Sequence, residues 1–188
     1  MTYGRDTHIG GPPLMPSPRH DDENAEQIMG AVDQLLGVIV SCPDEPVMIT
    51  GITAADILDA NDVFGNFTKV KVPKLGIIYS ATFWDLDDEG TQVDLELFKH
   101  VITQTASDAA WDPSDSNMLS FVTEIPFVSF DDHISSRTAE VNNIGKAYTA
   151  PEGFLWVQAV CRGTPTIAAG SSPRFQLQII SYDPTWRG

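Results

Sequence analysis

The sequence predicts an all-β protein: an antiparallel β-sandwich (jelly-roll-like) with an N-terminal extended arm and one short helix. Apolar and polar residues alternate in several short runs, which is typical of strands with one buried and one solvated face. Turn-forming residues separate these runs, and helical periodicity is lacking after residue 37. About ten short strands without intervening helices indicate a sandwich or a jelly roll.

Residues 1–20 are predicted to form the extended arm. The segments Gly10-Gly11-Pro12-Pro13 and Pro16-Ser17-Pro18 disfavour both a helix and a central strand. This composition also fits a disordered tail. We expect the arm to bind a neighbouring copy or another protein, with Leu14 and Met15 as its apolar contact residues.

Residues 21–37 carry the one convincing helical pattern. Asp21 or Asp22 can cap the helix, and Gly37 is a plausible stop. One apolar stripe recurs at helical spacing and consists of Ile28, Val32, Leu35 and Leu36. This stripe packs either on its own domain or between copies at a symmetry axis, so these residues are candidate partner contacts. The predicted organisation is an arm and helix over 1–45 and a β-sandwich domain over 46–188.

The strand pattern begins at Val38. Predicted strands cover 38–41, 47–53, 67–72, 77–84, 92–98, 119–124, 127–130, 147–149, 154–162 and 175–182. Within 92–98, alternation places Val93 and Leu95 on a buried face and Asp94 and Glu96 on a solvated one.

The acidic turn at 87–90 is predicted to join the strands over 77–84 and 92–98 into a β-hairpin. Its spacing from Asp85 to Glu96 resembles a twelve-residue calcium loop. That loop needs a helix on each side, whereas alternating strands flank this one. The hairpin, with Gly90 supplying a positive φ, is therefore the preferred interpretation.

Charge and composition exclude several classes of partner. The chain has 26 acidic and 11 basic residues, a net charge of −15, which disfavours binding to nucleic acid. No apolar run is long enough for a membrane span, and no secretory h-region is present, so synthesis in the cytoplasm is expected. Cys42 and Cys161 are expected to be buried hydrophobes, although a disulfide is possible in principle.

The sequence gives no pattern of a catalytic, cofactor or metal site. GxSxG, P-loop, GxGxxG, HExxH and CxxC motifs are lacking, and the four histidines follow no recognisable spacing. A distant carboxylate pair of the glycosidase type is conceivable in so acidic a chain. We nevertheless expect a protein that is not an enzyme and needs no cofactor.

Two tryptophans, Trp111 and Trp186, are predicted to lie in loops and are candidate binding residues. Exposed aromatic side chains in loops favour contact with sugars or with proteins. We favour contact between subunits over contact with carbohydrate at both positions.

Three segments resemble a family of β-sandwich virion proteins of tailed bacteriophages, the head decoration or cement type. They are Leu58–Gly65, the strand–turn–strand run Ser80–Phe98, and the run Trp156–Thr166 followed by a final amphipathic strand. The resemblance covers roughly residues 45–183 and brings no catalytic residues with it.

The resemblance implies a capsid decoration (cement) protein on the outer capsid surface of the virion. The expected partners are the major capsid protein and further copies of the chain itself. Cyclic symmetry favours a homotrimer, and neither nucleic acid nor a membrane is expected as a partner. The alternative is a tail or head-fibre module that binds glycans on the host surface. A polysaccharide-cleaving sandwich enzyme is the third possibility.

Overall fold

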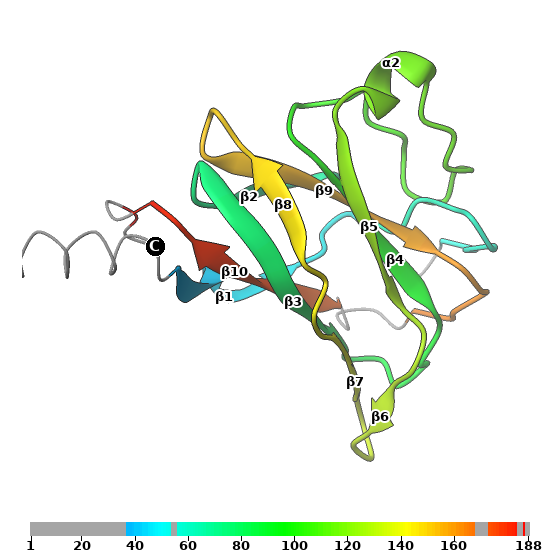
Figure 1. Ribbon diagram of the computed structural model, residues 1–188. Helices are drawn as coiled ribbons and strands as arrows, with labels where there is room; N and C mark the ends of the chain where they lie inside the picture. The colour runs from blue at the N-terminus through cyan, green and yellow to red at the C-terminus, as the bar shows by residue number, and fades with distance from the viewer. Residues whose placement is uncertain (1–36, 54–55, 168–172, 184–185, 187–188) are drawn as a thin grey trace, which may run out of the picture. The chain divides into compact units, whose positions relative to one another are not determined.

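A computed structural model describes residues 37–53, 56–167, 173–183 and 186, all within the unit formed by Leu36–Gly188. This unit is an all-β sandwich of two antiparallel sheets (Figure 1). The fold class predicted from the sequence is thus confirmed. The predicted arm over 1–20 and the predicted helix over 21–37, except Gly37, lie outside the described residues.

The described residues form ten strands and one short helix. They are β1 (Val38–Met48), β2 (Thr68–Lys71), β3 (Leu75–Asp85), β4 (Val93–Phe98), α2 (Asp115–Met118), β5 (Phe121–Phe127), β6 (Asp131–Asp132), β7 (Arg137–Val141), β8 (Lys146–Thr149), β9 (Phe154–Cys161) and β10 (Arg174–Ser181).

The two sheets have different sizes. The first, sheet A, has the order β1-β10-β3-β7-β6, and β8 pairs with the free end of β3. The second, sheet C, has the order β2-β9-β4-β5. Strand β1 pairs with β10 from Val38 to Met48 apart from a bulge, so the sheet begins before the predicted domain boundary at residue 45.

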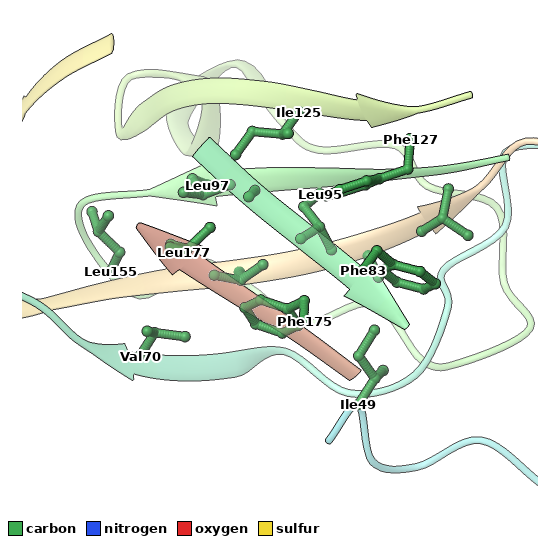
Figure 2. Close-up of a cluster of buried hydrophobic side chains, with 14 of the residues drawn as sticks. Ile49, Val70, Phe83, Leu95, Leu97, Ile125, Phe127, Leu155, Phe175 and Leu177 are labelled. Carbon is green, nitrogen blue, oxygen red and sulfur yellow. The ribbon is translucent and has the colours of Figure 1, made fainter. Parts of the chain in front are cut away.

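The core lies between the inner faces of the two sheets. Sheet A contributes Phe83, Phe175 and Leu177, and sheet C contributes Leu95 and Leu155, all at most 1% exposed (Figure 2). The rings of Phe83 and Phe127 meet across the sandwich at a centroid distance of 5.4 Å. Alternation in β3, β9 and β10 produces this core, because every second residue of a strand points to the same face.

The predicted hairpin between β3 and β4 is wrong. Strand β3 belongs to sheet A and β4 to sheet C, so residues 86–92 cross from one sheet to the other. The carboxylate of Asp85 organises this crossing, accepting the N–H of Asp87 at 3.0 Å and that of Gly90 at 2.7 Å. Gly90 has a φ of 62°, as the turn prediction required. Both carboxylate oxygens of Asp85 therefore accept hydrogen bonds from the backbone of the turn.

Three further elements differ from the sequence prediction. The predicted strand over 119–124 instead runs from 121 to 127 as β5, which tolerates Pro126 because it lies at the edge of sheet C. The predicted strand over 127–130 is wrong, since residues 128–130 are not in a strand. Strand β7 was not predicted, since Ala139 is its only buried residue and its apolar alternation is weak. The single turn of α2, capped by Ser114, was also not predicted.

Candidate functional site

The predicted contact residues of the N-terminal region cannot be placed. Leu14, Met15, Ile28, Val32, Leu35 and Leu36 all lie outside the described residues. Their proposed role in partner binding stays a prediction.

Trp111 packs against its own sandwich. It lies in the connection from β4 to α2, where its backbone N–H donates to the Asn61 carbonyl at 2.8 Å. Its ring meets that of Phe98 edge-on at 6.2 Å. The indole Nε1 is buried and faces the Glu96 carboxylate, outside strict hydrogen-bond geometry. Trp111 thus covers the outer face of sheet C, and only part of its side chain is accessible to a ligand.

Trp186 lies beside the edge strands β1 and β2, half-buried against the core. The Lys71 Nζ lies 5.1 Å from the centre of its ring, within the range of a cation–π contact. Two shallow hollows adjoin the indole, of about 380 Å³ beside Pro43 and Pro46 and about 280 Å³ beside Phe154. Trp186 therefore closes one side of the sandwich while it keeps an accessible surface.

The aromatic side chains on the outer face of sheet C contact one another. Phe67 stacks on Trp156 at a centroid distance of 5.2 Å and an interplanar angle of 17°. The Lys69 ammonium lies 3.8 Å from the centre of the Phe154 ring and 5.3 Å from that of Trp156. The rings therefore already contact one another or Lys69, and all three are only partly exposed. This arrangement does not support a role for them as a surface on which sugars stack.

A buried ionic cluster lies on the same outer face, where the sequence predicted solvated carboxylates. Asp94 is 3% exposed and Glu96 is 6% exposed, so that prediction is wrong. Arg162, which follows β9, binds Asp94 through Nε and approaches Glu124 at 3.4 Å and Glu96 at 3.9 Å through Nη2. Its Nη1 donates to Asn61 Oδ1 at 2.6 Å. One guanidinium group thus lies within ion-pair distance of three carboxylates.

This excess of acid over base alters the protonation of Glu96. Burial raises the pKa of Glu96 above its ordinary value, and Glu124 and Asp94 act in the same direction, against the indole of Trp111 and the Arg162 charge. One oxygen of Asp94, Oδ1, is buried without a hydrogen-bond partner in the part of the chain that is described. The cluster is best understood as a structural tie between β4, β5, β9 and Asn61.

The outer face of sheet A is apolar at one end of its strands. Ile39, Ile180 and Ile77 are cross-strand neighbours and share a face, while the adjacent Val40, Ile179 and Ile78 point inward. Leu75 and Tyr182 extend this row and are 56% and 44% exposed. We call these five outward residues the apolar end: Ile39, Leu75, Ile77, Ile180 and Tyr182.

The apolar end borders a hollow of about 540 Å³ whose lining has no charged side chain. Towards the other end of the same face, the outward residues are mixed: Gln176 lies opposite Thr82, and Arg174 lies between Trp84 and Met48. Exposed apolar patches of this kind typically mark protein contact sites. The apolar end is therefore the candidate functional site.

Sequence reasoning missed the apolar end, although a signal for it exists. The pairs Ile77-Ile78 and Ile179-Ile180 break the alternation of β3 and β10, so apolar side chains occur on both faces there. Consecutive apolar residues in a strand that otherwise alternates indicate that both faces are covered or available for contact.

No protein-family model and no curated protein matches the sequence. Among the residues described, no helix is long and apolar enough to cross a membrane. Within those same residues, no group of three or more histidine, cysteine or acidic side chains is arranged to hold a metal ion.

Proposed function

We propose that this chain is a capsid decoration (cement) subunit of a tailed bacteriophage, without enzymatic activity, which binds the major capsid protein on the outer surface of the virion. The β-sandwich and the resemblance of residues 45–183 to virion proteins of that type support the proposal. Its work would be mechanical: a rigid sandwich bound across the capsid lattice adds contacts that the lattice itself lacks.

The apolar end of sheet A carries this proposal. Leu75 and Tyr182 stay exposed in a chain with a net charge of −15, which otherwise favours solubility and repels similar molecules. An uncharged, hollowed surface loses little solvation on contact and gains about 25 cal/mol for each Å² of apolar area buried. It is therefore suited to a protein surface, and the acidic charge disfavours DNA as the partner.

Self-association belongs to the same proposal. Many copies of a decoration protein bind one shell, and symmetric assembly multiplies weak contacts through effective concentration. The homotrimer expected from the sequence, with the arm or helix exchanged between copies, stays a prediction.

The proposal is tested by locating the protein on the virion of the phage that encodes it. Antibody labelling followed by cryo-electron microscopy should place the protein over the whole head surface. Label restricted to the tail or to one vertex would refute the decoration role and favour the glycan-binding fibre alternative.

A matched pair of variants tests the surface itself. Leu75→Glu puts a charge into the apolar end, and Leu119→Glu puts the same charge at a residue that is 81% exposed beside α2. Shells that lack the protein should bind Leu119→Glu like the wild type and Leu75→Glu at least tenfold less. Equal binding of the two variants would show that the apolar end is not the shell contact.

A further inference from the structure

Strand β1 is an edge strand whose two halves differ. Among the described strands it has one neighbour, β10, so the other side of β1 presents its backbone groups outward. Unpaired edges template pairing with another strand, and natural proteins protect them with proline, charge and bulges.

The second half of β1 has all three kinds of protection. Residues 43–46 read Pro-Asp-Glu-Pro and form a bulge, because the ladder with β10 is interrupted between Cys42 and Val47. The Gln176 amide donates to the carbonyls of Pro43 and Asp44, at 2.9 Å in each case, and so fixes the bulge from inside the sheet. A further strand cannot pair along this half without breaking that arrangement.

The first half of β1 has none of these protections. Val38-Ile39-Val40-Ser41 contains no charge, no proline and no bulge, and pairs in unbroken register with residues 178–181 of β10. Val38 and Ile39 are 64% and 53% exposed. β-branched residues have the highest strand propensity, so this run is well suited to accept a partner strand.

We infer that the partner of this edge is a second copy of the chain, whose Val38–Ser41 pairs antiparallel with the same residues around a two-fold axis. An isologous interface requires a self-complementary surface, and an antiparallel ladder between identical runs provides one. The run itself carries no charge, so two chains of net charge −15 can pair their backbones there without juxtaposing carboxylates.

The pairing joins two functional surfaces into one. Ile39 is both an edge residue of β1 and the first member of the apolar end, so the apolar ends of the two copies become continuous across the axis. The inference does not depend on what the apolar end binds. It gives a two-fold assembly, in contrast to the three-fold assembly expected from the sequence.

Light scattering on the full-length chain tests the inference first. The wild type should elute with twice the 20.5 kDa mass of the chain. At high salt the dimer should dissociate less on dilution, because salt screens the repulsion between the acidic chains. Ile39→Lys should shift the mass to that of the monomer at the same concentration. Val128→Lys, at a β-branched residue that is 62% exposed after β5, is the matched control and should remain dimeric.

A cysteine cross-link tests the geometry. Cys42 and Cys161 are both fully buried, and burial raises the pKa of Cys42 to about 12, so neither thiol should react in the folded protein. Ile39→Cys should form a disulfide-linked dimer under mild oxidation, because cross-strand residues near the two-fold axis lie about 5 Å apart. Val128→Cys should stay monomeric on the same non-reducing gel.

Each alternative outcome overturns the inference. A monomeric wild type, a trimer mass, or a dimer that persists in Ile39→Lys without a cross-link in Ile39→Cys would each exclude edge pairing through Val38–Ser41. A cooperative unfolding transition of Ile39→Lys, at or below the melting temperature of the dimeric Val128→Lys control, establishes that loss of the dimer is not loss of the fold. A wild-type protein that is monomeric and still binds shells would refute the pairing alone. A wild-type dimer that binds no shell would refute the proposed function alone.

Discussion

Glu96 lies directly opposite Glu124 in the antiparallel ladder of β4 and β5, and Arg162 approaches both carboxylates from the end of β9. Like charges in directly opposite positions destabilise a sheet unless a counter-charge lies between them. Arg162 also binds Asp94, two residues before Glu96 on the same face. The stability of sheet C therefore depends on one guanidinium.

Replacing Arg162 with methionine should destabilise the protein by about 3 kcal/mol, at the lower end of the range for breaking a buried ion pair. The substitution keeps much of the aliphatic packing but leaves Asp94, whose side chain is 5% exposed, without its partner. Urea unfolding followed by tryptophan fluorescence measures the difference.

Arg137→Met is the control for that experiment. Arg137 also binds an aspartate through Nε, at 3.0 Å from Asp88, but both side chains are about one-third exposed. Solvent screening reduces such a pair to about 0–1 kcal/mol. Equal losses in the two variants would contradict the structural importance assigned to the buried cluster.

Glu96→Gln should stabilise the protein at pH 7 relative to the wild type. Burial and the neighbouring carboxylates raise the pKa of Glu96 above 4.5 in the folded state, so folding favours the protonated form. The charge on Glu96 then opposes folding increasingly as the pH rises from 4.5 through the folded pKa.

The advantage of Glu96→Gln should accordingly shrink as the pH falls towards 4.5, where the wild-type side chain becomes neutral in both states. Denaturation midpoints at pH 8, 7, 6 and 5 give this profile. Glu140→Gln, at an exposed residue of β7, should show no such trend. A stability difference between Glu96→Gln and the wild type that does not change with pH would indicate that the amide acts through packing.

Trp111→Ala should lower the stability by about 3 kcal/mol, because it removes an aromatic ring that packs on Phe98 and covers buried Glu96. Trp111→Phe should recover most of this loss, since it keeps a ring in contact with Phe98. Thermal unfolding measures both. A stable Trp111→Ala variant that loses affinity for glycans would instead assign Trp111 to a binding site.

Asp85→Ala should destabilise the protein by about 1.5–3 kcal/mol, the range for hydrogen bonds to a charged group. Its carboxylate holds the N–H groups of Asp87 and Gly90 in the crossing between the sheets. Glu152→Ala, in the exposed turn before β9, should have little effect. Millimolar Ca²⁺ should leave the melting temperature unchanged, because both Asp85 oxygens already accept backbone hydrogens. A rise on adding Ca²⁺ would restore the calcium-loop interpretation.

The positions of most strands follow from local sequence. The predicted strands over 77–84, 154–162 and 175–182 coincide closely with β3, β9 and β10. Their alternation is strong because one face of each builds the core, and turn residues mark their limits, such as Gly153 immediately before β9. Strand β7 escaped detection since its pairing with β3 depends on backbone hydrogen bonds and a single buried side chain, Ala139.

The site was harder to predict than the fold. Alternation shows which residues of a strand share a face, but it does not reveal whether another part of the chain covers that face. Asp94 and Glu96 were therefore placed in solvent, although the distant Trp111 and Arg162 lie over them. The apolar end was missed for the converse reason: Ile77 and Ile180 resemble core residues, and only the arrangement of the sheets places them on the outer face.

By itself, the sequence determined that the chain forms short antiparallel strands in a sandwich and that it carries a strongly acidic charge. Both properties are local or additive, since side-chain period, turn chemistry and charge can be read residue by residue. Tertiary structure alone decided that β3 and β4 belong to different sheets, that Arg162 contacts three carboxylates, and that half of β1 is an edge without a neighbour among the described strands. Each of these depends on which distant segments meet, and that choice minimises the free energy of the whole sandwich rather than of any one strand.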